Sequence, residues 1–138
     1  MSDWVIDASV AAKWFFPESH STRSIAILSP RNLLLAPDLI LPEFGNIVWK
    51  RARRSEISPD EAAEIMADFL RMPLVIVPST TLMNVALDLA LATRRTVYDC
   101  TYIALAIDRG YRMLTGDEKL ANALRGGPYA KYVKAIGD

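Results

Sequence analysis

The sequence has very little cysteine or histidine, and its charges cancel. Its 138 residues include one cysteine, Cys100, and one histidine, His20. A single cysteine excludes an internal disulfide and suits a reducing compartment such as the cytoplasm, and we expect Cys100 to lie in the core. A lone histidine disfavours catalysis by a histidine pair. Sixteen basic and sixteen acidic residues give no net charge, which argues against a broad basic surface for nucleic acid but allows a local one.

Long apolar runs and a targeting segment are also missing. No run reaches the ~18 apolar residues of a membrane span. The first residues lack a basic stretch, and the apolar residues after them are interrupted by Asp7 and Lys13. We therefore expect a cytoplasmic protein with no membrane partner. Hydrophobic residues make up 51% of the chain and charged residues 23%, as in ordinary globular proteins, and the length predicts one domain over residues 1–138.

Short apolar runs alternate with longer helical patterns along the chain. Four apolar residues in a row, with little alternation, are typical of strands buried on both faces. Such strands separated by helices predict an α/β fold with a parallel sheet. Strands are expected at residues 3–6, 33–36, 74–77, 112–115 and 132–136, and helices at 8–16, 19–28, 39–54, 59–72, 80–92, 98–109 and 118–124.

Three of these helices begin with recognisable capping residues. Ser58, Pro59 and Glu61 have the spacing of a capping box with proline in the first turn. Asp38 is expected to cap the helix predicted at residues 39–54, and Ser79 is expected to cap the helix predicted at residues 80–92.

Four carboxylates stand beside the apolar runs. Asp7 and Asp117 directly follow predicted strands, and Glu43 and Asp99 lie near helix starts. Ligands of parallel α/β folds bind beyond the carboxyl ends of the strands, so acids far apart in the sequence can meet there. Buried carboxylates need a partner or a metal, and a hard divalent cation would neutralise four that converge. The pattern points to a metal-dependent phosphoryl-transfer enzyme, with Asp7 and Asp99 as direct ligands.

Three polar residues lie close to these acids. Ser9 lies two residues after Asp7, and Thr115 lies two residues before Asp117. Either hydroxyl can therefore orient the nearby carboxylate. The alternative for both residues is that they cap the local backbone. Asn46 lies one helical turn after Glu43, on the same face, where it can orient Glu43 or touch substrate.

Four stretches taken together resemble the PIN domain, in particular the VapC-type ribonuclease toxins. They occur in the family's order, from the first predicted strand to the last fifth of the chain. The resemblance implies a three-layer α/β/α sandwich with a mostly parallel five-stranded sheet. The matching stretches are residues 5–10 (VIDASV), 42–46 (PEFGN), 98–106 (YDCTYIALA) and 114–117 (LTGD).

The same resemblance implies an activity and partners. The activity would be that of an endoribonuclease that depends on Mg²⁺ or Mn²⁺ and cleaves RNA phosphodiester bonds. The partners would be an RNA substrate, a cognate antitoxin protein of a type II toxin–antitoxin system, and a second copy in a homodimer. The family's functional positions carry over to the acids Asp7, Glu43, Asp99 and Asp117 and to the small polar residues Ser9 and Thr115.

A basic cluster ends the predicted helix 39–54. Residues 50–54 contain one lysine and three arginines. They can complement the helix dipole, contact RNA phosphates or contact an acidic partner, and Arg94 and Arg95 are further candidates for the phosphate role. Glu18 can border the acidic site, but we expect a solvated loop acid there.

Other functions fit the sequence less well or remain open. A response receiver needs an acid pair after the first strand and an aspartate after the third, and residues 74–79 contain none. A haloacid dehalogenase-like phosphatase needs an aspartate where Ser9 stands. Two alternatives stay open: a PIN-like module that binds RNA or protein without catalysis, and a metal-dependent nuclease that acts on DNA.

Overall fold

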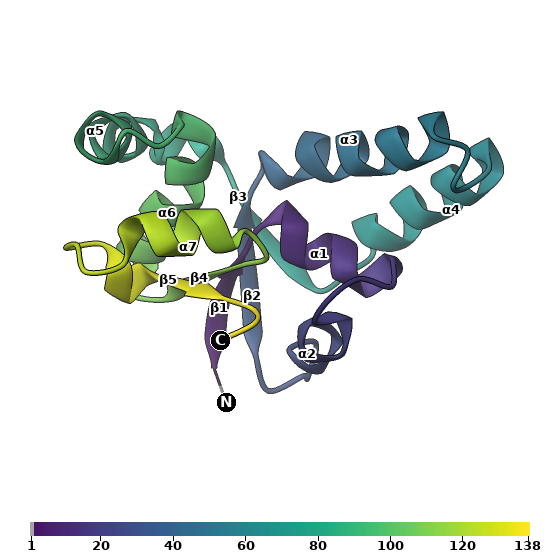
Figure 1. Ribbon diagram of the computed structural model, residues 1–138, viewed down its shortest axis with the longest axis horizontal. Coiled ribbons are helices and arrows are strands. Elements are labelled where there is room, and N and C mark those ends of the chain that lie inside the picture. The colour runs from purple at the N-terminus through teal and green to yellow at the C-terminus, as the bar shows by residue number, and fades with distance from the viewer. Residues whose placement is uncertain (1) are drawn as a thin grey trace.

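A five-stranded parallel sheet forms the centre of the computed structural model, which describes residues 2–138 (Figure 1). The strand order is β3-β2-β1-β4-β5, and every neighbouring pair is parallel. The predicted strands are confirmed: three have the predicted ends, and the ends of β2 and β5 differ by one residue. The strands are β1 (Asp3–Ile6), β2 (Leu33–Pro37), β3 (Leu74–Val77), β4 (Arg112–Thr115) and β5 (Val133–Ala135).

The central strand β1 lies between β2 and β4. Val5 is in register with Leu35 on one side and Met113 on the other, and all three side chains are buried. Burial on both faces explains why these strands are unbroken apolar runs. The edge strand β3 differs, because Val75 and Ile76 are exposed.

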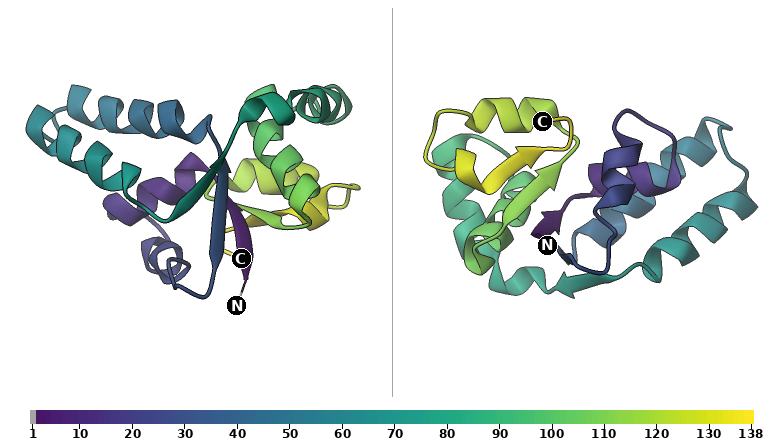
Figure 2. Two further views of the ribbon diagram at one scale, coloured as in Figure 1. Left: turned by 180° about the vertical axis from the view of Figure 1, so that it is seen from behind. Right: turned by 90° about the horizontal axis from the view of Figure 1, so that it is seen from below.

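Helices cover the sheet on both sides, as the α/β/α prediction requires. Helices α1 to α4 lie on one side and α5 and α6 on the other, while α7 packs beside β5 (Figures 1 and 2). Within residues 2–138, no helix is both long and apolar enough to cross a membrane. The helices are α1 (Ala8–Phe15), α2 (Ser21–Ala26), α3 (Ile40–Arg53), α4 (Pro59–Leu70), α5 (Met83–Thr93), α6 (Val97–Arg109) and α7 (Glu118–Leu124).

Three aromatic rings pack the helices α3 and α4 against α1. The rings of Phe44 on α3 and Phe69 on α4 stack with centroids 3.9 Å apart. Phe15 of α1 meets both rings edge-on, at 5.4 and 6.4 Å. These buried contacts fix the first turns of α3 above the sheet, and Glu43, the neighbour of Phe44, is placed with them. Phe16 is buried in the core, and the partly buried Phe15 packs against it.

Helix α6 is enclosed between α5 and the sheet. Every residue of the turns 100–106 is buried, including Cys100, so its predicted core position is confirmed. Thr96 caps the helix by accepting a hydrogen bond from the Asp99 backbone N–H, and Gly110 ends it with a φ of +69°, a conformation that glycine adopts without strain. The buried helix therefore presents its first turns at the carboxyl end of the sheet.

One capping prediction is confirmed and two are wrong. Ser58 and Glu61 form the expected capping box at the start of α4. Asp38 does not cap α3, which begins at Ile40 with Leu39 at the cap, and Ser79 opens a short 3₁₀ turn instead of capping α5. The two side chains bind each other, with the Ser79 hydroxyl donating to the Asp38 carboxylate. Both residues follow the paired strands β2 and β3, whose ends lie side by side.

Candidate active site

All four predicted acids line one cavity of about 300 Å³ beyond the carboxyl end of the sheet. The cavity lies at the switch point of the sheet topology, where β2 and β3 lie on one side of β1 and β4 and β5 lie on the other. Ligands of open α/β sheets bind at such a point. The three polar candidates divide: Ser9 and Asn46 line the cavity, and Thr115 is buried beside it. The polar residues that line the cavity are Asp7, Ser9, Glu43, Asn46, Lys50, Asp99, Tyr102 and Asp117.

Asp7 is the most enclosed of the acids, with 8% of its surface exposed. It caps α1, and its Oδ1 accepts hydrogen bonds from the Val10 N–H at 3.0 Å and the Ser9 hydroxyl at 2.6 Å. The Thr115 hydroxyl donates to Oδ2 at 2.5 Å. Burial raises the pKa of Asp7 above its usual value, although the two hydroxyls oppose the rise. The charge of Asp117 raises that pKa further.

Asp117 belongs to the same network of hydrogen bonds. It caps α7, with its Oδ1 accepting from the Leu120 N–H at 3.1 Å, and its own N–H donates to the Thr115 hydroxyl at 3.0 Å. The Gly116 N–H donates to the Ser9 hydroxyl at 2.8 Å. A Cβ atom at Gly116 would lie only 3.0 Å from Ser9 Oγ and from Lys13 Cε. The loop after β4 thus approaches α1 so closely that a side chain at Gly116 would push its neighbours away by a few tenths of an ångström.

Glu43 stands in the first turn of α3 and is held from the other side of the cavity. The Tyr102 hydroxyl donates to Glu43 Oε1 at 2.5 Å, and the tyrosine itself is 3% exposed. Burial raises the pKa of Glu43, the Tyr102 bond lowers it, and the nearby charges of Asp7 and Asp99 raise it again. Burial also raises the pKa of the Tyr102 hydroxyl, which remains a hydrogen-bond donor.

Tyr102 is the residue of this cavity that sequence reasoning missed. Its partner Glu43 is 59 positions away in the chain, so no local pattern joins them. One signal was available, because Tyr102 follows Asp99 by three residues on α6 and therefore shares its helical face.

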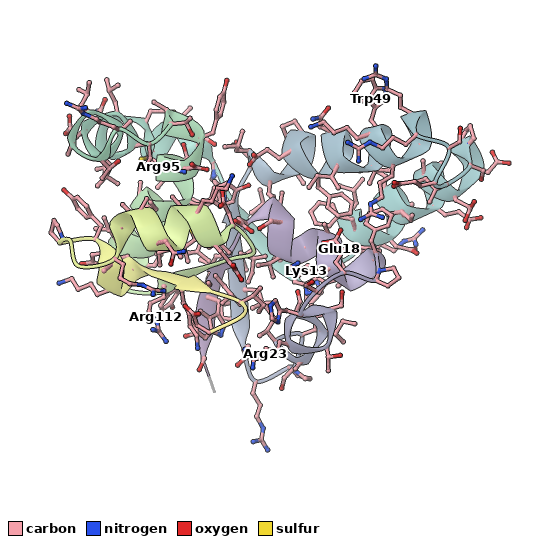
Figure 3. All side chains as sticks on the ribbon, viewed as in Figure 1. Lys13, Glu18, Arg23, Trp49, Arg95 and Arg112 are labelled. Atoms are coloured by element: carbon pink, nitrogen blue, oxygen red, sulfur yellow. The ribbon has the colours of Figure 1, made fainter. Side chains whose placement is uncertain are left out.

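Asp99 lies in the first turn of α6 beside an arginine. Arg95 Nη2 is 3.6 Å from Asp99 Oδ2, and Figure 3 shows the arginine where α5 joins α6. Burial raises the pKa of Asp99, and the Arg95 charge opposes the rise. Arg95 Nε is buried and has no hydrogen-bond partner within residues 2–138. Its companion Arg94 ends α5 in a left-handed conformation, with a φ of +61°.

The basic cluster that ends α3 divides into separate roles. Lys50 lines the acidic cavity, on the helical face that carries Glu43 and Asn46. Arg51 instead pairs with Glu18 at 2.5 Å and lies 4.2 Å from the centre of the Phe16 ring.

Arg53 and Glu18 also have partners outside the cavity. Arg53 lies over the ring of Trp49, which points outward from α3 (Figure 3). Glu18 is not the solvated acid that we expected, because it pairs with Arg51 and is 3.5 Å from Lys13 Nζ. The loop that begins at Pro17 brings Glu18 against α1 and α3, so that Lys13 and Arg51 are both close to its carboxylate.

The donor set fits a hard divalent cation, although it does not form a closed cage. Within residues 2–138, no three acidic, histidine or cysteine side chains form a group that could hold a metal ion by themselves. Two carboxylate oxygens that accept no hydrogen bond from the described residues are Glu43 Oε2 and Asp117 Oδ2. Mg²⁺ prefers oxygen ligands and keeps several waters, so one or two direct carboxylates suffice. Burial and the charges of neighbouring acids raise the pKa values of three of the acids, and a bound cation would favour their ionised forms.

Fold and cavity together define a PIN-type α/β protein, and the comparison with known families agrees. The chain matches the PIN domain over residues 4–125 and belongs to the PIN domain family. The resemblance drawn from four sequence stretches is therefore confirmed.

Individual proteins show the same relationship. Ribonuclease VapC3 of Pyrobaculum aerophilum is 34% identical over 119 residues, which cover 85% of this chain and 91% of the relative. Two solved structures share the fold at low identity. VapC20 of Mycobacterium tuberculosis, a toxin that cleaves the sarcin–ricin loop, has a TM-score of 0.63 at 16% identity, over 87% of this chain and 95% of its own. A toxin–antitoxin complex from Klebsiella pneumoniae has a TM-score of 0.62 at 11% identity, over 96% and 97%.

Proposed function

We propose that this protein is an endoribonuclease that depends on Mg²⁺ or Mn²⁺ and serves as the toxin of a type II toxin–antitoxin system. The observation that carries the proposal is the meeting of four carboxylates from β1, α3, α6 and the end of β4 in one cavity. Kinship with a protein named as a ribonuclease supports RNA as the substrate.

Each acid has a part in the proposed reaction. Asp7, Glu43, Asp99 and Asp117 would hold the cation between them. A bound Mg²⁺ or Mn²⁺ relieves charge on the phosphoryl oxygens and makes water more acidic. Hydrolysis then joins a water oxygen to phosphorus while the bond from phosphorus to the leaving sugar oxygen breaks and that oxygen gains a proton. Ser9 and Thr115 keep Asp7 in one orientation, and Lys50 is placed to bind a phosphate of the RNA.

A cleavage assay with metal exchange tests the proposal. We expect the purified chain to cut RNA with exposed loops when Mg²⁺ or Mn²⁺ is present, to stop in EDTA, and to resume when the metal is restored. Asp99→Asn should lose activity, whereas Asp108→Asn should keep it. Asp108 is an exposed acid on the same helix, outside the cavity. Cleavage that persists in EDTA, or equal activity of the two variants, would contradict a metal site at these acids.

A binding module without catalysis is the second candidate. The observation in its favour is that no three acids of residues 2–138 form a group that could hold a metal unaided. RNA binding without cleavage at any metal concentration would support this candidate. Cleavage of a matched single-stranded DNA but not of the RNA would instead support a DNA nuclease.

The antitoxin is the proposed protein partner. Its support is the likeness to VapC-type proteins and to a toxin–antitoxin complex. Expression of the chain alone should arrest growth, and co-expression of a small protein encoded beside it should restore growth. Normal growth with the chain alone would count against the toxin role.

A homodimer is the other proposed assembly. Seven of the eleven large apolar side chains exposed within residues 2–138 fall between residues 70 and 91, and exposed apolar surface of this kind marks protein interfaces. We call this part of the molecule the apolar segment. Its exposed side chains are Leu70, Val75, Ile76, Met83, Val85, Leu87 and Leu91.

A further inference from the structure

The bond between Tyr102 and Glu43 joins two helices from opposite sides of the sheet. Tyr102 comes from α6 and Glu43 from α3, and these helices lie on the two sides of the sheet in Figure 1. The hydroxyl reaches Glu43 Oε1 at 2.5 Å within the acidic cavity. A neutral donor on a carboxylate makes a strong, short hydrogen bond when both groups are shielded from water.

Two other acids of the cavity accept hydrogen bonds from donors close to them in the sequence, and Asp7 also accepts one from the distant Thr115. Asp7 is held by Ser9 and Val10, and Asp117 by Leu120. Glu43 has no such neighbour: within residues 2–138, the hydrogen bond to its carboxylate comes from Tyr102. A glutamate side chain has three rotatable bonds and loses up to about 2 kcal/mol of rotamer entropy when it is fixed. One phenol hydroxyl therefore selects the conformation of this acid.

We propose that Tyr102 is a positioning residue that holds Glu43 in the cavity through Oε1 and leaves Oε2 for the divalent cation. This inference rests on the proposed function, because it assumes that Glu43 helps to hold a cation. The tyrosine ring also fills buried space, so the substitution that tests the proposal keeps the ring. Tyr102→Phe removes the hydroxyl alone.

The first measurement is Mn²⁺ binding to the full chain without RNA, by calorimetry or by electron paramagnetic resonance. Removing a residue that orients a metal ligand typically weakens metal affinity or activity by a factor of 10 to 100. We expect Tyr102→Phe to weaken Mn²⁺ binding by about 10-fold and to lower kcat by about 10-fold, with KM for RNA within about twofold of the wild type. Tyr111→Phe is the matched control, because Tyr111 lies at the other end of the sheet, and it should match the wild type.

The second measurement separates positioning from packing. If Tyr102 acts through Glu43, the double variant Tyr102→Phe with Glu43→Gln should bind Mn²⁺ no more weakly than Glu43→Gln alone. Wild-type Mn²⁺ affinity in Tyr102→Phe, or effects of the two substitutions that simply add, would overturn the proposal. So would a wild-type chain that binds no Mn²⁺. A wild type that binds Mn²⁺ but cleaves no RNA would refute the proposed function only, since the binding series still decides the role of Tyr102.

Discussion

The acidic cavity and the apolar segment add nothing to the stability of the folded chain, for opposite reasons. In the cavity, Asp7 is almost fully enclosed, and burial raises its pKa together with those of Glu43 and Asp99. In the apolar segment, by contrast, Leu91 is 74% exposed and Leu87 51%. The cavity concentrates charge away from water, and the segment leaves apolar surface in water.

The two regions also differ in how firmly their side chains are held. The acids are fixed by hydroxyl and backbone donors, including Ser9, Thr115 and Tyr102. The exposed leucines of α5 have no such fixation, and strand β3 of the apolar segment is an edge of the sheet. The difference indicates that the cavity is prepared for a small ligand with strict geometry, whereas the exposed side chains of the segment suit apolar contacts. The following predictions separate the two.

The largest effect is expected from Asp7→Asn. The change removes a charge from the centre of the cavity, and we expect cleavage to fall by at least about 1,000-fold, equivalent to about 4 kcal/mol in the barrier. The fold should persist, because the amide oxygen can still accept from Ser9 and Val10. Rates measured with and without added Mg²⁺, together with circular dichroism, check both points. Wild-type rates in this variant would remove Asp7 from the site.

The next effect concerns the apolar segment. Leu87 and Leu91 lie one turn apart on α5, and changing both to glutamate should weaken self-association by about 100-fold while leaving the cavity intact. Sedimentation or light scattering reports the mass, and the cleavage assay reports the cavity. Ile25→Glu on α2 is the control, since Ile25 is equally exposed at 51% outside the segment. A wild-type chain that is monomeric at all concentrations would contradict the dimer.

A smaller effect is expected from pH on the metal-free chain. The folded-state pKa values of Asp7, Glu43 and Asp99 are raised, so the folded state binds more protons than the unfolded state between the ordinary and the raised values. Stability should therefore fall as pH rises through that window, by at most about 1.4 kcal/mol per pH unit for each group.

Denaturant unfolding of wild type and Asp7→Asn, at a series of pH values that starts near the ordinary carboxyl pKa of about 4 and ends at neutral pH, measures this dependence. The variant should show a shallower loss of stability with rising pH, and at neutral pH it should be more stable than the metal-free wild type. Parallel curves for the two proteins would show that Asp7 is not protonated preferentially in the fold.

The smallest effect should come from the basic residues of α3. Lys50→Ala should raise KM for RNA a few-fold and lower the slope of log affinity against log salt by about one. Arg54→Ala, the same loss of charge one turn further on and outside the cavity, should change the slope less. Equal changes in the two variants would indicate that the whole cluster contacts RNA.

The local parts of this molecule were predictable, and the contacts between distant elements were only partly so. The capping box of Ser58 and Glu61 involves residues three apart, so the sequence alone predicts it. The proximity of Asp7 and Asp117 could be predicted because both follow strands of a parallel sheet, and such strands end at the same edge of the sheet.

The errors arose where a distant residue competes with a local one. Asp38 has the sequence of a helix cap, yet it binds Ser79, 41 positions away. Glu18 was expected in solvent, yet Arg51 reaches it from α3. Tyr102 was missed because its partner lies on another helix. Each depends on a side-chain conformation that no periodicity encodes.

The tight contact at Gly116 has a consequence for how this cavity can change its width. The loop that carries Asp117 is hydrogen-bonded to Ser9 and leaves little room for a further carbon atom at Gly116, and Thr115 joins the same loop to Asp7. The wall formed by β1, α1 and the β4–α7 loop therefore moves as one piece. Across the facing wall, the hydrogen bond between Tyr102 and Glu43 links α6 to α3, so breaking that bond would free the Glu43 side chain while the helices stay packed on their neighbours.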